Sequence, residues 1–577
     1  NGQVPQIAFA AQELEAAMKE VDRGDLQITL KVDPDESSAE AYQIRPTSSN
    51  RIEITGTDAN GAMYGGLEVA DRLQLGLPIE NQDQQPFVKK RGVKINIPLD
   101  IRTPSFDDSG GSAQKNIETM WDFEFWKEYL DDLARYRYNV VSLWAAHPFP
   151  TMIKLEEYPD IAIDDVYYSK EGSLTTTHLD AAVRLDEDTK SKLGLGKKIT
   201  IDEKIKYWQK VFQYAQDRGI EIMMVHWNVH LHGAVGKYGI TNEQENPATI
   251  KYLRACVREM LLTYSQITGI GTCAGENDDR YLRNEYMTER FVFNSYGKAV
   301  MDVKELQPDR DIRFIMRRHS TEYPDVRDAF EDYTGGKMEA SVKYAVAHMY
   351  SSRRPQEWEK RIVDEGWLDS YKIWLNVRND DIFMHRWGSP DYARDFIKWM
   401  PHEHIAGFYM GSDTYVWGRE FISKNPEMSG RLEIDKHWYN FRLWGQLAYN
   451  NELDDSYWEA ALKHRFPSID AKRLLAAWES VSEVIPQVNR SVWSPTDGSF
   501  AAEGARRTTG FLTVDGYQFE RPAMVLNRIE NAPDPQCITV TDWAKAKLAG
   551  KELEGVTPLQ VAENLDSYAA DAQAALP

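Results

Sequence analysis

The sequence predicts an α/β protein built on a (β/α)8 TIM barrel, with a small α/β domain before the barrel and a mostly helical domain after it. Short apolar runs alternate with amphipathic helix patterns eight times within about 330 residues, which is typical of parallel strands closed into a barrel. An open doubly wound sheet is the structural alternative. No strand is followed by GxGxxG, a phosphate loop or another nucleotide motif, and this favours the barrel.

Residues 1–88 form the predicted N-terminal α/β domain. Ile28–Val32 and Arg51–Thr55 alternate with the two-residue period of a strand, and Ala59–Leu75 carries apolar residues at helical spacing. The polar stretch Glu80–Pro86 is the best linker in the chain, so we expect this domain to end there.

Residues 89–430 form the predicted barrel. Its strands are expected at Gly92–Leu99, Asn139–Ala145, Ile220–Asn228, Thr268–Ala274, Asp311–Met316, Met338–Ala345, Tyr371–Val377 and Ile405–Met410. The sixth of these has the weakest pattern. Amphipathic helix patterns lie between them at Phe125–Arg137, Ile205–Asp217, Ile250–Thr263 and Pro390–Trp399.

Residues 431–577 form the predicted helical domain, which is rich in aromatic residues. Its helix patterns begin with Trp438, Phe441, Trp444 and Leu447 and continue at Trp458–His464, Ala471–Val484 and Pro558–Leu576. The last pattern stops abruptly, so we expect the natural chain to continue past Pro577. The chain starts at Asn1 rather than Met. We therefore expect a removed export signal and a periplasmic or secreted protein, although a shortened chain would explain the same start.

The composition excludes several classes of partner. The chain has 577 residues with 68 Lys and Arg against 90 Asp and Glu, for a formal net charge of −22. This balance argues against a nucleic-acid or anionic-membrane partner, because phosphate neutralisation needs clustered Lys and Arg. The longest apolar runs are far shorter than the about 20 residues that cross a bilayer, so no membrane span is predicted.

The 17 Trp and 29 Tyr suit stacking on sugars as well as core packing. The oligomeric state stays open, a homodimer included.

Seven of the eight strands end in polar residues, and in a barrel the chemistry lies at these carboxyl ends. Each end alone is typical of a solvated loop, but seven in succession predict a shared polar pocket. Its predicted residues, in strand order, are Trp144 and His147; His226 and Asn228; Glu276 and Asn277; Arg317, Arg318 and His319; Lys343 and His348; Arg378, Asp380 and Asp381; and Asp413.

Glu276 is the strongest single candidate among the acids. Strand parity places it on one face with the small residues Thr272 and Ala274, which leave room for a ligand. The alternative is a loop carboxylate that caps the following helix. Asp380 and Asp381 close the seventh strand, where they are either a second catalytic carboxylate or part of an Asx turn.

Cations gather on three consecutive strand ends of this acidic chain: Arg317, Arg318, Lys343 and Arg378. Together they predict a pocket for a carboxylate or sulfate, because the Arg fork matches such groups. The alternative is that they balance Asp380, Asp381 and their neighbours.

No metal or other cofactor is predicted. The histidines, including His226, His230 and His232, raise a metal as an alternative, but no HExxH or comparable ligand spacing occurs. No GxSxG is present, and Cys273 lies in an apolar strand with parity opposite to Glu276, which disfavours a Ser or Cys nucleophile.

Three segments resemble known exo-glycosidases. Ile54–Gly66 is similar to the small α/β domain before the barrel in family 20 hexosaminidases and in the α-glucuronidases of glycoside hydrolase families 67 and 115. Arg91-Gly92-Val93 fits the start of their first barrel strand, and Trp438–Tyr449 resembles the helix after the barrel in α-glucuronidases. The resemblance implies a divergent member of this group, with Glu276 as the general acid. The Asp and Glu that activate water in family 67 have no counterpart by motif.

The expected function is therefore an exo-acting, α-glucuronidase-like glycoside hydrolase that removes a uronic or otherwise acidic sugar from a complex polysaccharide or oligosaccharide. Asp381, or else Asp380, is expected to be the second carboxylate; a separation of about 6.5–9.5 Å from Glu276 implies inversion and about 5–5.5 Å implies retention. One alternative is a hexosaminidase-like enzyme whose substrate supplies the nucleophile, although Gly275-Glu276 replaces the usual Asp-Glu pair. Another is a non-catalytic carbohydrate-binding relative.

Overall fold

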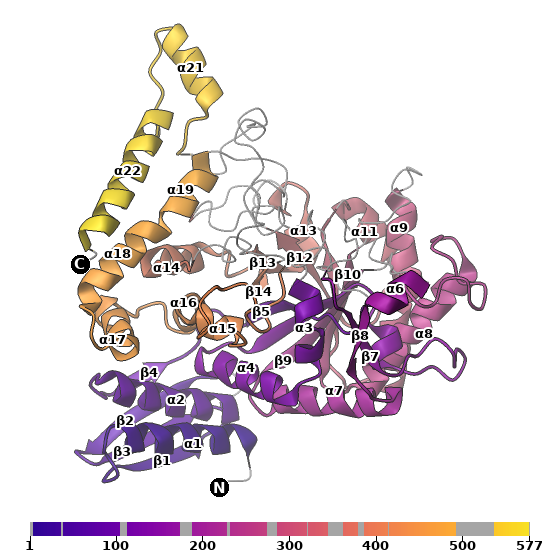
Figure 1. Ribbon diagram of the computed structural model, residues 1–577, viewed down its shortest axis with the longest axis horizontal. Coiled ribbons are helices and arrows are strands. Elements are labelled where there is room, and N and C mark those ends of the chain that lie inside the picture. Colours follow the sequence, from indigo (N-terminus) through magenta and orange to yellow (C-terminus); the bar gives the residue numbers. More distant parts are fainter. Residues whose placement is uncertain are drawn as a thin grey trace.

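The computed structural model describes residues 4–35, 38–103, 112–172, 187–227, 231–273, 285–319, 321–343, 353, 362–378, 386–412, 415–491 and 536–575. Figure 1 shows a small α/β unit, a central barrel and a C-terminal set of helices, in that order along the chain.

The N-terminal unit is a four-stranded sheet in the order β1-β3-β2-β4. Strands β1 (Gln27–Val32) and β3 (Arg51–Gly56) are parallel, and helix α2 (Ala59–Leu75) packs on the sheet as expected. Asp58 caps α2 by accepting a hydrogen bond from the Gly61 amide. A Cβ atom at Gly65 would lie 2.5 Å from Ile54 Cγ2, so glycine is needed where the helix crosses the sheet.

Three elements of this unit were not predicted. Helix α1 (Pro5–Glu20) packs on α2, and strand β2 (Tyr42–Ser48) pairs antiparallel with β3. The predicted linker Glu80–Pro86 is in part a strand, because β4 (Gln82–Gln84) pairs with β2. The polar character of β4 is explained by its position at the edge of the sheet, where side chains reach solvent.

The central domain is a closed barrel of eight parallel strands, which confirms the predicted fold class and all eight predicted strands. In order they are β5 (Arg91–Asn96), β6 (Val140–Ala145), β9 (Glu221–Trp227), β10 (Ile267–Cys273), β11 (Arg313–Arg317), β12 (Lys337–Lys343), β13 (Lys372–Arg378) and β14 (Ile405–Gly411). Strand β14 pairs with β5 and closes the barrel.

Helices surround the barrel (Figure 1): α3 (Ser112–Met120), α4 (Phe123–Arg135), α5 (Phe149–Met152), α7 (Ile201–Gln216), α8 (Pro247–Thr263), α9 (Glu285–Val292), the π-helix η4 (Phe293–Gly297), α10 (Lys298–Leu306), α11 (Tyr323–Ala329), α13 (Trp367–Ser370) and α14 (Pro390–Trp399). Between β6 and α7 the chain inserts the unpredicted hairpin β7 (Val166–Ser169) and β8 (Leu193–Lys197) with the short helix α6 (Glu187–Lys192).

Two apolar clusters distinguish the faces of the barrel strands. Trp144, Ile315, Trp374 and Tyr409, from four different strands, belong to one cluster that fills the barrel interior. Their strand neighbours belong instead to the large core that the strands share with the helices. Because side chains alternate along a strand, membership of these clusters shows which positions point inward.

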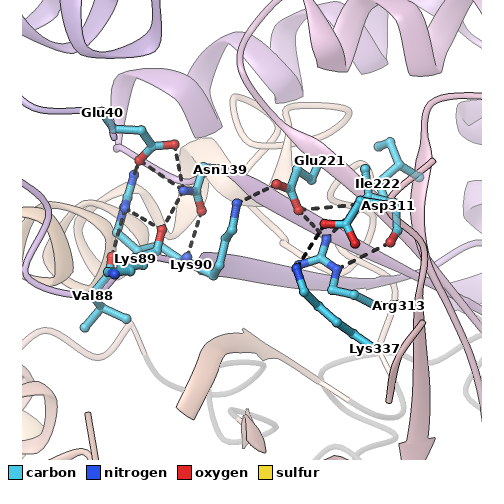
Figure 2. A network of polar contacts seen from close by, with 12 residues as sticks. Glu40, Val88, Lys89, Lys90, Asn139, Glu221, Ile222, Asp311, Arg313 and Lys337 are labelled. Carbon is cyan, nitrogen blue, oxygen red and sulfur yellow. Dashed lines mark hydrogen bonds and ion pairs between the residues drawn. The ribbon is translucent and has the colours of Figure 1, made fainter. Parts of the chain in front are cut away.

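A polar seam joins the N-terminal unit to the amino-terminal end of the barrel (Figure 2). The fully buried Arg91 donates from Nη2 to Glu40 Oε2 at 2.7 Å, and Asn139 Nδ2 donates to Glu40 Oε1 at 2.9 Å. The Arg91 amide also donates to Asn139 Oδ1 at 2.8 Å. The seam therefore holds together residues far apart in the sequence, at the end of a barrel where side chains serve stability.

The same end of the barrel is closed by ion pairs around Glu221 (Figure 2). Lys90 Nζ lies 2.5 Å from Glu221 Oε1, and Arg313 bonds to Glu221 Oε2. Trp374 Nε1 donates to Glu339 Oε2 at 2.5 Å. Glu221 thus pairs with Lys90 just before β5 and with Arg313 on β11, and Glu339 accepts from Trp374 on β13, so both carboxylates are structural.

The C-terminal helices follow the barrel: α15 (Glu433–Lys436), α16 (Trp438–Tyr449), α17 (Asp455–Arg465), α18 (Ala471–Ser482), α19 (Val484–Ser491), α21 (Val540–Leu548) and α22 (Pro558–Ala575). Helix α16 touches both preceding units: Tyr138 donates to the Phe441 carbonyl at 2.9 Å, and Arg442 pairs with Asp71 at 2.6 Å. Helix α22 packs along α18 and α19 (Figure 1). The domain boundaries at residues 88 and 430 stay predictions.

Candidate active site

Inward-facing polar residues collect at the carboxyl end of the barrel. We call the set Lys94, Trp144, Arg317, Asn376 and Tyr409 the barrel mouth. Each is at most 1% exposed. Lys94 lies between Val93 and Ile95, Asn376 lies between Leu375 and Val377, and Arg317 follows Met316, all apolar residues of the outer core. The polar side chains therefore point into the barrel, where a TIM barrel places its active site.

Two cations of the barrel mouth lie against one indole ring. Lys94 Nζ is 4.3 Å and Arg317 Cζ is 4.9 Å from the centroid of the Trp144 ring. The ring is oriented by a hydrogen bond from Trp144 Nε1 to Ser142 Oγ at 2.8 Å. A cation over an indole gains roughly 2 kcal/mol when desolvated. Two positive charges held at one buried place attract an anion more strongly than they would in water, so the arrangement suits an anionic group of a ligand.

On strands β12 to β14 the barrel mouth adds neutral hydrogen-bonding groups. Ser341 Oγ and Tyr409 OH share a hydrogen bond between strands β12 and β14. Asn376 lies on the intervening strand β13, in register with Lys343 and Tyr409. Lys343 is half-buried at the end of β12, in line with the inward-facing Ser341. The mouth thus combines charged and neutral hydrogen-bonding groups around aromatic rings.

Five polar residues of this region were not predicted from the sequence: Lys94, Asn96, Ser341, Asn376 and Tyr409. A signal existed in β5, where Lys94 and Asn96 alternate with apolar residues. A barrel strand is covered on both faces and normally apolar on both. Polar residues at every second position of such a strand indicate an inner face that lines a site.

Thr272, predicted to leave room for a ligand beside Glu276, lies on the outer face of β10. Cys273 belongs to the interior cluster, so Thr272 points outward, toward the helices. The inward positions of β10 are Gly269, Gly271 and Cys273, and it is these residues that leave space inside the barrel. Glu276 itself lies outside the described residues, and its role stays a prediction.

Two histidines predicted to bind substrate lie on the outer face of the barrel. His226 pairs in register with Thr272 and packs on Phe149 and on Tyr296 of η4, with ring centroids 4.8 and 6.1 Å away. Burial lowers the pKa of His226 to about 3, so the ring is neutral. The structure therefore does not bring His226 into the barrel mouth.

His147 occupies the same outer layer. It is 1% exposed, with Nδ1 2.9 Å from the His232 carbonyl oxygen and Nε2 3.4 Å from Tyr252 OH on α8. These contacts hold the segment after β6 against the helical layer, so His147 fixes a loop and does not reach the mouth.

The predicted pair Arg317-Arg318 is divided between the two faces. Arg317 points inward, whereas Arg318 donates from Nε to Glu365 Oε2 at 2.9 Å. Glu365 also accepts from Trp367 Nε1 at 2.9 Å. Arg318 is thus balanced by the carboxylate of Glu365.

The remaining predicted residues are placed only in part. His319 follows β11 and is half-buried, and Arg378 is the last residue of β13, paired in register with Gly411. Seven predicted residues lie outside the described residues: Asn228, Glu276, Asn277, His348, Asp380, Asp381 and Asp413. Within the described ranges, no three His, Cys, Asp or Glu side chains are grouped as a metal site. No helix in the same ranges is long and apolar enough to cross a membrane.

The fold is similar to that of a solved glycoside hydrolase structure. No protein-family model and no curated protein matches the sequence. Among solved structures, the whole chain is similar to a GH138 enzyme targeting pectin rhamnogalacturonan II, with a TM-score of 0.77 at 18% identity, and it spans 64% of that chain. A glycoside hydrolase family 20 β-N-acetylglucosaminidase matches 79% of this chain and 88% of its own, with a TM-score of 0.47 at 14% identity. The likeness to the GH138 enzyme shows a shared fold, the barrel with its flanking units.

Proposed function

We propose that the protein is an exo-acting glycoside hydrolase that removes a uronic or otherwise acidic sugar from a complex polysaccharide or oligosaccharide. The observation that carries this proposal is the pair Lys94 and Arg317, buried against Trp144 at the carboxyl end of the barrel. The cations suit a carboxylate, and the aromatic rings suit the apolar face of a sugar.

The shared fold supports a carbohydrate substrate. An enzyme that targets pectin rhamnogalacturonan II has the same barrel with flanking units, and TIM barrels keep their active sites at the carboxyl ends of the strands whatever the chemistry. Fold alone does not set function, so the specificity for an acidic sugar rests on the residues of the barrel mouth.

The proposed chemistry uses two carboxyl groups. Glu276 follows β10 and would protonate the leaving oxygen, while Asp381, or Asp380, follows β13 and would act as base or nucleophile. Glycoside hydrolysis needs one group of each kind on opposite sides of the scissile bond. Strands β11 and β12 lie between β10 and β13 in the barrel order, so the two acids would face each other across the mouth.

A kinetic screen tests the assignment of Glu276. Glu276→Gln should lose roughly 10²–10⁴-fold in kcat on acidic oligosaccharides with poor leaving groups, because general acid catalysis contributes about that much. Activated aryl glycosides need little protonation and should lose much less.

Equal and slight losses on both kinds of substrate would contradict the assignment of Glu276. Failure of the intact protein to cleave any glycoside while still binding acidic sugars would favour the non-catalytic alternative.

A further inference from the structure

The side-chain amide of Asn376 belongs to the barrel mouth but takes no part in the contacts of Lys94 and Arg317 with Trp144. Asn376 is 1% exposed and points inward from β13. Across the described part of the chain, neither its Oδ1 nor its Nδ2 has a hydrogen-bond partner. Buried side-chain polar groups in folded proteins are paired in the large majority of cases, because an unpaired one costs free energy.

The strands beside β13 do not satisfy this amide. Ser341 on β12 and Tyr409 on β14 bond to each other instead. The residues in register with Asn376 are Lys343 on β12 and Tyr409 on β14, and within the described residues neither bonds to its amide, whose donor and acceptor face the inside of the barrel.

We propose that Asn376 is a specificity-determining residue that binds hydroxyl groups of the sugar held in the barrel mouth. This inference rests on the proposed function and deepens it. A carboxylate only accepts hydrogen bonds, so it would pair Nδ2 and leave Oδ1 unpaired. A hydroxyl group both donates and accepts, so one hydroxyl, or two on adjacent carbons, satisfies both atoms of the amide.

Different residues of the barrel mouth therefore bind different groups of the sugar. Lys94 and Arg317 bind the carboxylate, and Asn376 forms hydrogen bonds with ring hydroxyls at one position. A sugar that lacks the matching hydroxyl would leave the buried amide unpaired, and sites built to bond a hydroxyl reject such analogues strongly.

The experiment measures binding by calorimetry with the intact protein, Asn376→Leu and Asn376→Asp. The probes are D-glucuronic acid, D-galacturonic acid, the monodeoxy analogues of each, and neutral D-glucose and D-galactose. The control variant is Thr272→Val, which removes a buried polar atom from the outer face of β10, away from the mouth.

The intact protein should bind one acidic sugar and bind one of its deoxy analogues on the order of 10- to 100-fold more weakly. Asn376→Leu should weaken binding of the full sugar by a similar factor and bind the two compounds equally. It should also raise the melting temperature of the free protein, since an unpaired buried amide is replaced by an apolar group. Asn376→Asp should weaken the acidic sugar further by charge repulsion.

Thr272→Val should keep both the affinity and the discrimination. If Asn376→Leu keeps the discrimination against the deoxy analogue, the role of Asn376 is wrong while the proposed function stands. If the intact protein binds no acidic sugar, the proposed function fails and this inference fails with it.

Discussion

Buried polar residues at the ends of the barrel strands differ according to the face from which they project. On the inner face, Lys94 and Arg317 lie against the ring of Trp144. On the outer face, His226 has no hydrogen-bond partner for either ring nitrogen within the described residues. Burial lowers its pKa to about 3, so the outer layer holds a neutral imidazole.

This buried imidazole should make the protein sensitive to acid. The pKa of histidine in an unfolded chain is about 6.5, so between pH 6.5 and 3 the unfolded state binds a proton that the folded state does not. Stability therefore falls as the pH falls through this window, by about 2 kcal/mol between pH 7 and pH 5. In His226→Phe, the melting temperature should fall less over this range than in the intact protein.

His464→Gln is the control, because His464 is 42% exposed and keeps solvent contact in the folded state. An equal fall in melting temperature for the intact protein and for His226→Phe would contradict the assigned protonation state.

At the scale of the elements, the sequence predicted the strands of the barrel better than the faces of those strands. Most barrel strands contain a short apolar run, and all eight were predicted. The same property hides orientation, since both faces are buried and apolar. The alternation of side chains along β10 therefore grouped Glu276 with Thr272 on a predicted ligand-facing side, whereas Thr272 points outward in the structure.

Edge elements were harder to predict. Strand β4 is Gln-Asp-Gln and looked like a linker, because only its pairing with β2 makes it a strand. Helix α1 owes its place to packing on α2, a contact between distant segments that sequence periodicity does not show.

The seam between the N-terminal unit and the barrel should be essential for stability. Glu40→Gln leaves the fully buried Arg91 without its carboxylate, and breaking a buried ion pair in this way costs about 3–5 kcal/mol. Thermal unfolding should show a clear drop in melting temperature. The double variant Glu40→Gln, Arg91→Met should recover part of it, because no unpaired charge remains.

The matched control is Glu53→Gln. Glu53 and its partner Lys31 are 48% and 51% exposed, and such surface pairs contribute about 0–1 kcal/mol. Equal effects of Glu40→Gln and Glu53→Gln would show that the seam does not stabilise the fold.

At the scale of the whole molecule, the N-terminal unit and helix α16 meet at the amino-terminal end of the barrel, whereas α18 contacts the segment after β13, where Trp387 Nε1 donates to the Ser482 carbonyl at 2.9 Å. The seam at Glu40 and helix α16 both lie near the first barrel strands, where Tyr449 OH donates to the Glu40 carbonyl at 2.5 Å. A formal charge of −22 surrounds a mouth with two buried cations.

Activity should not depend on a metal ion. Hydrolysis by paired carboxyl groups uses a proton donor and a base or nucleophile, and neither role requires a cation. Exhaustive dialysis against a chelator should leave kcat/KM unchanged. A loss of activity that one added divalent cation restores would contradict the carboxylate mechanism.

In the proposed function, the barrel mouth binds an acidic sugar through Lys94 and Arg317. The most direct measurement is the ratio of kcat/KM for an acidic glycoside to kcat/KM for its carboxyl-reduced, neutral counterpart, in the intact protein, Lys94→Met, Arg317→Met and Arg318→Gln. The intact protein should prefer the acidic compound, and each inward variant should lose on the order of 10- to 100-fold of that preference, since a charge-assisted hydrogen bond contributes about 1.5–3 kcal/mol. Arg318→Gln, on the outer face, should keep the preference. Equal cleavage of both compounds by the intact protein, or an unchanged preference in both Lys94→Met and Arg317→Met, would contradict the claim.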